Sequence, residues 1–548
     1  MTHSVVRRTF PLSSRLSWPA FARWQLTLLS ALILTLFYNE PLLSRLDVMA
    51  GGHATTQVMF LLLGINIFLC QLLAFGRWQK PWLVLLFTLS ATSQYFMQQY
   101  GILLDKDMLI NVLETDSHEA AALLNLHMLA YFSGYLLLPA YLLLRLPLSR
   151  KTYTAWSGYI ASLAAALLVI VVLVVCQYQL YAGTFRQHRE LKHLALPLSA
   201  LTSGISLAKA QAQQMSATEF VRYAEDAHMT PAISAKPRLI IMVLGETVRA
   251  DHLGINGYGR DTTPLLSQRK LINFGAIDSC GTATAISVPC MFSYLTKQHY
   301  DATLARNSDN ALDVLQRAGV KVIWRDNNSG CKAVCDRVEQ DQTFTQNSAY
   351  DCKDGGCPDL TLLNGLAERI THSAATGQPV LVVLHQQGNH GPEYYKRSLK
   401  HHKQFLPECQ SNLLHQCEQQ HIINAYDNAI VATDQLLDDS INLLEQLKDK
   451  YDTAMLYVSD HGESLGENGI YLHGLPYWLA PPAQTQVPFV MWLSDGIQQQ
   501  LAVKSHCLGD SGKLSHDYLF DSLLSLYSVQ SRAYRPDYDV FGRCHAAG

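Results

Sequence analysis

The sequence predicts two parts: an α-helical membrane domain of five transmembrane helices and, after it, an α/β domain. Three observations support this prediction. Long apolar runs fill the chain before about residue 182, short apolar segments alternate with helical patterns after about residue 238, and ten of the 12 cysteines lie beyond residue 279. The chain has 548 residues, too many for one compact domain, and its charged fraction of 16% is low for a soluble protein.

Domain boundaries are placed where the composition changes. Residues 1–181 form the predicted membrane domain, residues 182–236 a bridging helix and linker, and residues 237–548 the α/β domain. The net charge of −3 is close to zero, so nothing in the charge balance points to nucleic acid as a partner.

Five apolar segments are long enough to cross a bilayer, which takes roughly 20 residues. They are Trp24–Leu43, Gln57–Phe75, Trp82–Tyr100, Ala121–Leu144 and Ala155–Leu180. The basic residues of the short flanks all fall on one side of these spans, at positions 7, 8, 15, 23, 77, 80, 145, 150 and 151. Because such residues stay in the cytoplasm, five spans place the α/β domain on the opposite side of the membrane.

The outer loop Gly101–Ala120 is acidic, yet apolar residues recur in it at helical spacing. These residues are Met108, Leu109, Val112 and Leu113. The pattern is compatible with an amphipathic helix at the membrane surface or with a solvated connector. In the first case Asn111, Glu114 and Glu119 are polar groups that could meet a lipid head group.

The cysteines of the α/β domain are closely spaced. They lie at 280/290, 331/335, 352/357 and 409/417, with 507 and 544 left over. An even number in close pairs is typical of disulfides in an oxidising compartment. Zinc knuckles are the alternative, and we disfavour them because the pairs are scattered and no Cys-x-x-Cys occurs.

Short apolar runs in the α/β domain predict strands. The runs are Leu239–Leu244, Val320–Trp324, Val380–His385, Met455–Ser459 and Phe489–Leu493. Helical stretches at Ala311–Ala318 and Ala429–Leu447 alternate with them, which predicts a mostly parallel sheet. Ligands bind such sheets at the carboxyl ends of the strands.

Polar residues follow several of these strands directly. Glu246, Asp460 and His461 offer carboxylate and imidazole ligands from two strand ends, which predicts a zinc or manganese site. Each of these residues alone is a weak indication, since an Asp-His pair after a strand is more often structural. His390 and His473 could contact a phosphate or hold a second ion, whereas histidines 401, 402, 415 and 421 lie in a polar region and are interpreted as surface residues.

The stretch Ser279–Cys290 carries hydroxyl groups at the expected start of a helix, on Thr282, Thr284 and Ser287. Backbone N–H groups at a helix N-terminus suit a phosphate under attack, and a divalent ion would lower the pKa of a hydroxyl bound to it. The alternative is a surface loop closed by a disulfide.

Taken together, the motifs resemble those of the lipid A phosphoethanolamine transferases, a family that includes the mobile colistin-resistance enzymes. The motifs are Gly245-Glu-Thr-Val-Arg-Ala-Asp-His252, Ser279-Cys-Gly-Thr-Ala-Thr284, Ser287-Val-Pro-Cys-Met-Phe292, Gly388-Asn-His-Gly-Pro392 and Ser459-Asp-His-Gly-Glu-Ser-Leu-Gly-Glu467. The resemblance covers essentially the whole chain. It implies a bacterial inner-membrane enzyme that crosses the membrane several times and has an alkaline-phosphatase/sulfatase-like catalytic domain in the periplasm.

The resemblance also assigns residues. Thr284 matches the nucleophile and a zinc ligand, and Glu246, Asp460 and His461 match the remaining ligands of one tightly bound Zn²⁺. The residues that match substrate contacts are Asn111, Glu119, Ser329, Lys332, His390 and His473, the two histidines also being candidates for catalysis or for a second zinc ion. The expected disulfides are Cys280–Cys290, Cys331–Cys335, Cys352–Cys357, Cys409–Cys417 and Cys507–Cys544.

The implied reaction is a two-step covalent transfer. Thr284 attacks phosphatidylethanolamine, diacylglycerol leaves, and a phosphate of lipid A then takes the phosphoethanolamine group. The added cation would lower susceptibility to cationic peptides such as polymyxin. Membrane lipids are the expected surroundings, and a monomer is the expected state.

Three alternatives remain open from the sequence. A related enzyme on the same scaffold could use another acceptor, such as a core sugar of lipopolysaccharide or a glycerol-phosphate polymer. A hydrolase would pass the phosphoryl group to water. A membrane-tethered binding domain without activity is disfavoured because the ligand positions are intact.

Overall fold

The computed structural model describes most of the chain. The described residues are 20–74, 76–115, 117–149, 156–216, 219–230, 236–346, 350, 352, 356–373, 377–501 and 512–542. They belong to two compact units that interleave along the sequence: unit 1 comprises Met1–Gln94 and Leu129–Leu198, and unit 2 comprises Tyr95–Met128 and Ser199–Gly548. The domain boundaries placed after residues 181 and 236 stay predictions.

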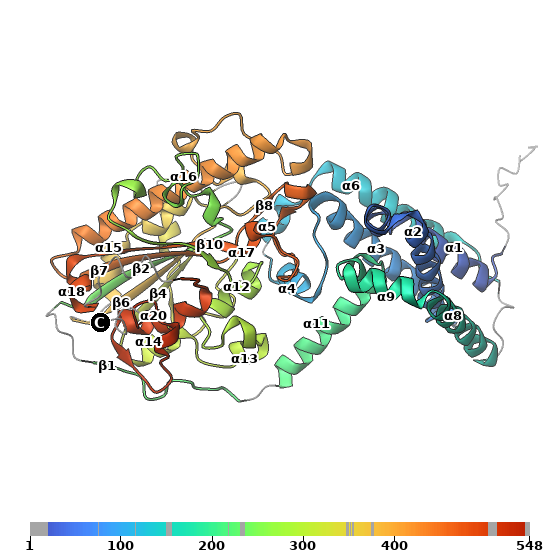
Figure 1. Ribbon diagram of the computed structural model, residues 1–548, viewed down its shortest axis with the longest axis horizontal. Coiled ribbons are helices and arrows are strands. Elements are labelled where there is room, and N and C mark those ends of the chain that lie inside the picture. Colours follow the sequence, from blue (N-terminus) through green and yellow to red (C-terminus); the bar gives the residue numbers. More distant parts are fainter. Residues whose placement is uncertain are drawn as a thin grey trace, which may run out of the picture. The chain divides into compact units, whose positions relative to one another are not determined.

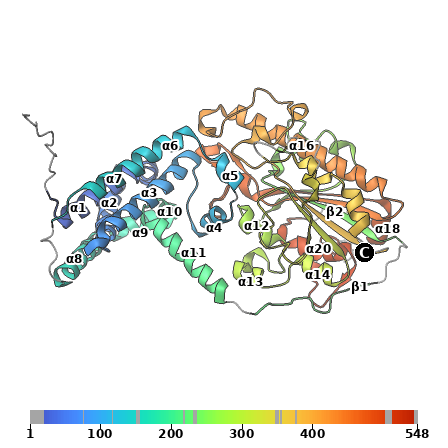
Figure 2. The same ribbon diagram turned by 180° about the vertical axis from the view of Figure 1, so that it is seen from behind.

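Unit 1 is helical. Its elements include α1 (Arg23–Phe37), α2 (Glu40–Gln71), most of α3 (Gln79–Tyr100), α7 (Leu138–Arg145), α8 (Trp156–Cys176), α9 (Tyr178–Gln187) and α10 (Leu191–Leu194). Figure 2 shows these helices, whose colours run from blue to green in chain order. Within the described residues, three helices are long and apolar enough to cross a membrane: Glu40–Gln71, Leu126–Arg145 and Trp156–Cys176.

Five spans are therefore not confirmed. The first predicted span breaks after Phe37, because the Asn39 side-chain amide donates to the Leu34 carbonyl at 2.8 Å and to the Leu196 carbonyl at 2.9 Å. This leaves α1 with only 15 residues. The helix α3 has 22 residues but a less apolar sequence, with four glutamines at positions 94, 98, 99 and 79.

Unit 2 is built on a seven-stranded sheet in the order β3-β10-β7-β2-β6-β4-β5. The strands are β2 (Arg238–Gly245), β3 (Ile272–Asp278), β4 (Lys321–Asp326), β5 (Glu339–Gln340), β6 (Val380–His385), β7 (Asp452–Ser459) and β10 (Gln486–Leu493). The strands from β7 to β5 are parallel, as the alternation with helices predicts, whereas β10 runs antiparallel to both β7 and β3. The sequence did not predict β3, because only Ile272 and Ile277 of this edge strand are buried.

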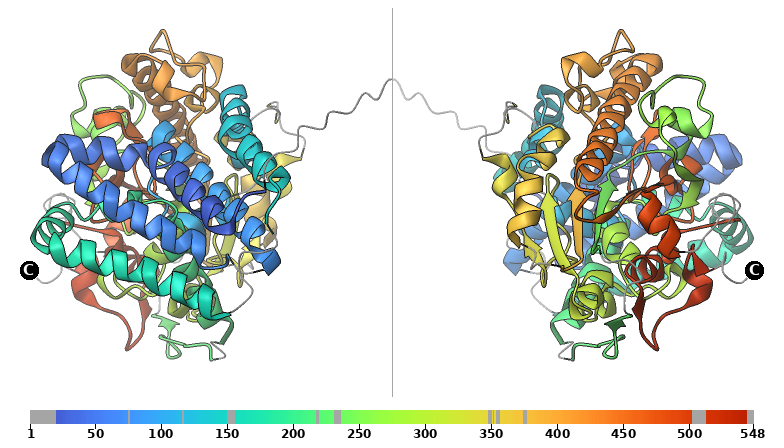
Figure 3. Two further views of the ribbon diagram at one scale, coloured as in Figure 1. Left: turned by 90° about the vertical axis from the view of Figure 1, so that its right-hand side faces the viewer. Right: turned by 90° about the vertical axis from the view of Figure 1, so that its left-hand side faces the viewer.

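Helices cover both faces of this sheet (Figure 1; end-on views in Figure 3). Alternate residues of β2 point to opposite faces: Ile240, Met242 and Leu244 join one buried cluster, and their neighbours join the other. The first cluster includes residues of α12 (Thr284–Met291), α14 (Ala311–Arg317) and α20 (Leu519–Leu526). The second includes residues of α15 (Leu366–Ser373) and α16 (Gln419–Gln446).

The register of the parallel strands brings their carboxyl ends level with one another. Gly245 of β2 is paired with Ser459 of β7, and His385 of β6 is paired with Leu244 on one side and Asp326 on the other. The residues that follow these four strands therefore emerge side by side at one edge of the sheet, which is where a ligand site is expected.

The outer loop near residue 110 is helical and belongs to unit 2. It forms α4 (Lys106–Glu114) and α5 (Ser117–Ala122), and the carboxylate of Asp105 begins α4 by accepting from the Met108 N–H at 2.8 Å. The helix α4 packs against α12, as Figure 2 also shows. The predicted helical pattern is thus correct, while contact with a membrane surface stays a prediction.

Candidate active site

Four predicted residues meet at the carboxyl edge of the sheet. Thr284 begins α12, Glu246 follows β2, and Asp460 and His461 follow β7. The Thr284 hydroxyl lies 3.2 Å from both carboxylate oxygens of Glu246 and 3.4 Å from Nε2 of His461. All four side chains are buried, so this cluster is shielded from bulk water.

The cluster fits a divalent cation. Ligand atoms of Glu246, Asp460 and His461 all lie within 4.8 Å of one another. The Asp460 Oδ2 atom is buried and has no hydrogen-bond partner among the residues described, which is a costly arrangement unless a cation is present. Two carboxylates and one imidazole, with a hydroxyl beside them, form a donor set that zinc accepts.

The pKa values of Glu246, Asp460 and His461 are also compatible with a metal site. Burial and the neighbouring Asp460 charge raise the pKa of Glu246, and burial raises the pKa of Asp460 to about 6. Burial and the nearby His473 lower the pKa of His461 to about 4, so its ring is neutral and able to bind a metal. Burial is the largest cause of all three shifts, because burial disfavours the charged form of a group that is removed from water.

A second group of possible metal ligands contains two cysteines, and it is not a metal site. Cys331 and Cys335 lie near Asp336, but the two sulfurs are joined as a disulfide. The predicted pairs 280/290, 352/357 and 409/417 are also disulfides, which contradicts the zinc-knuckle alternative for these cysteines. Cys507 and Cys544 lie outside the described residues.

Hydrogen bonds hold the stretch around Thr284 in place. The Thr282 hydroxyl donates to the Leu475 carbonyl at 2.6 Å, and the Ser287 hydroxyl donates to the Asp460 carbonyl at 2.5 Å. The surface-loop alternative for this stretch is wrong, because Thr282, Thr284 and Ser287 are all buried.

His516 also fixes this stretch, and the sequence did not single it out. Its Nδ1 accepts from the Cys280 N–H at 3.0 Å, and its Nε2 donates to the Ser459 carbonyl at 2.9 Å. Burial lowers the pKa of His516 to about 3, so the ring stays neutral and connects the segment before α12 with the end of β7. A lone histidine far along the chain gives no local signal for this role.

Asn328 is a further residue that sequence reasoning missed. It follows β4, and its amide donates to the Glu246 carboxylate at 2.6 Å and to the Gln386 carbonyl at 2.8 Å. The bond fixes the orientation of a candidate metal ligand. Its position just after a strand was the available signal, but the family motif assigned only its neighbours Ser329 and Lys332.

The two predicted histidines flank the cluster. The ring centroid of His473 lies 4.5 Å from that of His461 and 5.1 Å from that of His390. His473 is held by the buried carboxylate of Glu463 at 2.7 Å, and Glu463 also accepts from the Tyr394 hydroxyl at 2.6 Å. Glu463 was missed, although it follows the Asp-His-Gly motif.

His390 forms an ion pair with Glu119 of α5, and the His390 Nε2 atom lies 3.0 Å from the Glu119 Oε1 atom. Burial lowers the pKa of His390, but the Glu119 carboxylate outweighs burial and raises it to about 9. Burial raises the pKa of Glu119, yet His390 holds it at about 2. Both groups are therefore charged over a wide range of pH.

The predicted head-group contacts converge on the same region. The Lys332 ammonium donates to the Ser329 hydroxyl at 3.0 Å and to the Glu114 carbonyl at 2.9 Å. Arg306 forms an ion pair with the Glu114 carboxylate. Asn111 is buried on α4, the helix that packs against α12.

Of the four histidines interpreted as surface residues in the polar region near residue 400, His402 is buried. His401 and His415 are exposed and His421 is half-buried, in line with a surface location. His402 is buried, and its Nδ1 accepts from the Leu399 N–H at 3.2 Å. Burial and the adjacent His401 lower the pKa of His402 to about 4, so the neutral ring serves to close a turn.

The fold and this site define a member of the sulfatase superfamily. The family model described as Sulfatase matches residues 238–529, and a second family model, described as Phosphoethanolamine transferase EptA/EptB, matches residues 62–212. The chain belongs to the phosphoethanolamine transferase family, and it is an enzyme of that class.

Known relatives support this membership over most of the chain. The phosphoethanolamine transferase EptA of Escherichia coli K12 is 38% identical over 88% of this chain and 88% of its own length. The phosphatidylethanolamine transferase Mcr-1 of Escherichia coli is 39% identical over 86% of this chain and 88% of its own. The structure of the integral membrane protein lipooligosaccharide phosphoethanolamine transferase A of Neisseria meningitidis matches with a TM-score of 0.90 and 32% identity, covering 96% of this chain and 99% of that one.

Proposed function

We propose that this enzyme transfers phosphoethanolamine from phosphatidylethanolamine to a phosphate group of lipid A and releases diacylglycerol. The observation that carries the proposal is the position of the Thr284 hydroxyl, 3.2 Å from the Glu246 carboxylate at the buried N-terminus of α12. The names of the relatives supply the transferred group. Each transfer would add a cation to an anionic lipid surface and so weaken binding of polymyxin.

In the first step, Thr284 is the nucleophile that attacks the phosphorus of the donor lipid. Glu246, Asp460, His461 and the Thr284 hydroxyl would hold Zn²⁺, which when bound lowers the pKa of a hydroxyl and offsets negative charge on phosphoryl oxygens. Asn328 fixes the Glu246 carboxylate, and Ser287 and His516 fix the chain on either side of the nucleophile. The products are diacylglycerol and phosphoethanolamine esterified to Thr284.

In the second step, a phosphate oxygen of lipid A attacks the same phosphorus, and Thr284 leaves as its hydroxyl form. His390 and His473, both at the edge of the cluster, are the proposed groups that give and take the protons of the leaving and attacking oxygens, and their closeness to His461 supports this role. Lys332 adds positive charge near the phosphoryl group, while Asn111, Glu119 and Ser329 are the proposed contacts to the ethanolamine head group.

The proposed location is the bacterial inner membrane, with unit 2 in the periplasm. Four disulfides within the described part of the chain support an oxidising compartment. The apolar helices of unit 1 and the match to an integral membrane protein support membrane insertion.

A direct test is mass spectrometry of lipid A after incubation of the purified full-length protein with phosphatidylethanolamine and lipid A. We expect lipid A that carries phosphoethanolamine, together with an equal amount of diacylglycerol. Free phosphoethanolamine without modified lipid A would instead identify a hydrolase. Release of no more than one diacylglycerol per protein, with neither product, would mean that the phosphoethanolamine group stays on the protein and that the acceptor is another molecule, such as a core sugar.

A further inference from the structure

Unit 1 contains a cavity of about 940 Å³. Residues of α1 and α7 form most of its wall, and Phe87 of α3 completes it. Most of these residues are apolar, among them Leu26, Ile33 and Leu143. The volume falls within the range of about 300–1,000 Å³ that is usual for small-molecule sites.

The cavity has a buried base and an open side. Leu26 and Phe87 are buried, whereas Leu29, Leu138 and Leu142 line the cavity and are between 40% and 54% exposed. Contact with water is unfavourable for such side chains, so an apolar molecule is the favoured occupant.

One end of the cavity is basic. Arg145 lines it there, and the Lys80 ammonium donates to the carbonyl groups of Leu144 and Leu146 at 2.8 and 2.7 Å. The Arg145 guanidinium lies 5.3 Å from the centre of the Tyr141 ring. Within the described part of the chain, Arg145 forms no ion pair with an acidic side chain.

The start of α1 adds a further cation to this end. Arg23 of α1 donates to the side chain of Gln79, at the start of α3, at 3.3 Å. The segments that form this part of unit 1 are residues 20–38, 76–100 and 129–149, and none of them contains an Asp or Glu. No acidic residue of these segments therefore offsets the positive charge.

The depth of the cavity is close to that of one leaflet of a bilayer. Its lining runs along α7 from Leu138 to Leu146, about 12 Å of helix, and half of a hydrocarbon core of about 30 Å is about 15 Å. The basic flanks predict that this end faces the cytoplasm. Basic pockets between transmembrane helices on that side suit anionic lipid head groups.

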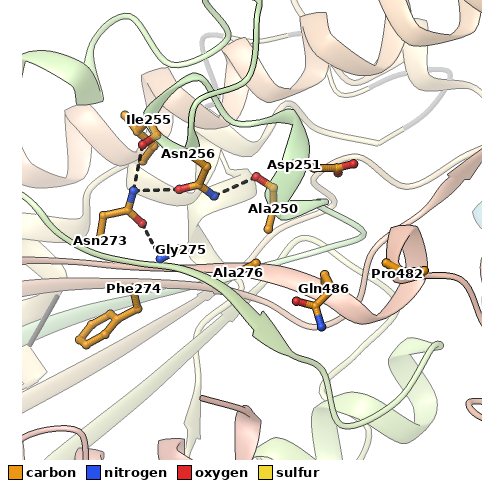
Figure 4. Close-up of a pocket in the computed structure, with 10 residues that line it drawn as sticks. All are labelled: Ala250, Asp251, Ile255, Asn256, Asn273, Phe274, Gly275, Ala276, Pro482 and Gln486. Carbon is orange, nitrogen blue, oxygen red and sulfur yellow. Dashed lines mark hydrogen bonds between the residues drawn. The ribbon is translucent and has the colours of Figure 1, made fainter. Parts of the chain in front are cut away.

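A cavity in unit 2 shows the opposite case. It measures about 560 Å³ and lies beside β3 (Figure 4). Its two asparagines bond to the protein itself: Asn273 donates to Asn256 at 2.8 Å, and Asn256 donates to the Ala250 carbonyl at 2.8 Å. Polar side chains can satisfy one another in this way, whereas exposed apolar side chains need an apolar partner.

The charges select among phospholipids. A zwitterionic head group brings an ammonium group, which would meet cations here and no carboxylate of the three segments. The Glu119 carboxylate, a proposed contact for ethanolamine, belongs to unit 2. An anionic head group offers phosphate oxygens to a guanidinium without adding a cation. The cavity therefore suits a lipid of net negative charge rather than the donor lipid.

We propose that this cavity binds an anionic phospholipid of the cytoplasmic leaflet, with an acyl chain along α1 and α7 and the phosphate at Arg145. The choice of leaflet rests on the proposed location of the enzyme. The lipid is not a substrate: it covers the exposed side of the cavity and neutralises the basic end.

Native mass spectrometry of the full-length protein tests the charge selection. The protein is released from detergent micelles that hold phosphatidylglycerol and phosphatidylcholine in equal amounts. We expect the wild-type protein to retain about tenfold more phosphatidylglycerol, and Arg145→Ala to lose this excess. Arg145→Lys keeps the charge and most of the excess. Arg77→Ala removes an exposed cation that does not line the cavity, and it changes retention by less than about twofold.

A soluble probe tests the part played by the acyl chain. Glycerol 3-phosphate carries the phosphate without acyl chains, and we expect it not to displace the retained lipid. Displacement by this probe, equal retention of the two lipids by the wild-type protein, or unchanged retention in Arg145→Ala would overturn the assignment. None of these readouts requires transfer to lipid A, so failure of the proposed reaction would be seen separately.

Discussion

Two halves of the active site are built in different ways. The nucleophile and metal-ligand half consists of buried residues at the ends of neighbouring strands and at the start of one helix. The Thr284 hydroxyl lies 3.2 Å from Glu246 and 3.4 Å from His461, and the three candidate metal ligands lie within 4.8 Å of one another. The substrate half relies on α4 and α5, which end at Ala122, long before the sheet begins at Arg238, and it is held by ion pairs such as Glu119–His390. The first half depends on the register of the parallel strands. The second half depends on individual ion pairs, each of which a single substitution can remove.

Loss of a residue in the first half has the largest expected effect. Glu246→Gln keeps the shape of the side chain but removes a charge from the candidate metal site. We expect bound zinc to be lost and transfer to fall by about 100-fold or more. Elemental analysis of the purified protein measures the metal, and assay of lipid A measures the transfer.

The control is Glu445→Gln, since Glu445 is about half exposed and pairs with Arg269 at 3.3 Å. It is expected to retain both zinc and activity. Unchanged zinc in Glu246→Gln would show that the ligand assignment is wrong.

The Glu119–His390 pair predicts a pH dependence of intermediate size. The pKa of His390 is raised from 6.5 to about 9, so the stability that its charge contributes is complete below pH 6.5 and is lost as pH rises through about 9. The pKa of Glu119 is lowered from 4.5 to about 2, so its contribution is complete above pH 4.5 and is lost as pH falls through about 2. The pair is therefore strongest between pH 4.5 and 6.5.

Glu119→Gln removes the charge that keeps His390 protonated. We expect the alkaline limb of the activity profile to move to lower pH, with a loss of about tenfold at pH 8. Glu418→Gln is a matched control, because Glu418 pairs with the partly exposed His421 at 3.4 Å. An alkaline limb at the same pH in both variants would break the link between this pair and activity.

The smallest effect concerns the attachment of α4. Arg306→Ala removes the ion pair with Glu114 and leaves the Lys332 bond to the Glu114 carbonyl in place. We expect hydrogen exchange of the α4 amides to quicken by about fivefold, in keeping with a partly exposed ion pair worth at most about 1 kcal/mol. Lys106→Ala breaks only an exposed contact with its neighbour Asp107 and serves as control. Equal exchange in the two variants would mean that Arg306 does not hold α4.

The contrast between the two halves also explains what could be predicted from the sequence. Glu246, Asp460 and His461 follow continuous apolar strands, and parallel strands bring such residues together whatever the loops do. Asn328 and His516 were missed because each acts on a residue far away in sequence, and Glu463 was missed although its partner His473 is only ten residues further on, since a single side chain leaves no periodic signal.

Three other features that the sequence did not predict also have physical causes in the structure. The first predicted membrane span is interrupted by Asn39, whose amide bonds depend on a partner at Leu196 that the sequence pattern does not reveal. The edge strand β3 is only partly buried, so its residues lack the apolar run that marked the central strands. The burial of His402 depends on the turn around it rather than on its polar neighbours.

The central claim is that Thr284 carries the phosphoethanolamine group between the two lipids. Intact-protein mass spectrometry after incubation with phosphatidylethanolamine alone tests it most directly, with Thr284→Ala as the control. We predict that the wild-type protein gains one phosphoethanolamine group, that peptide mapping places it on Thr284, that Thr284→Ala gains none, and that later addition of lipid A removes it. Transfer to lipid A at the full rate by Thr284→Ala, with no adduct on the wild-type protein, would contradict the account.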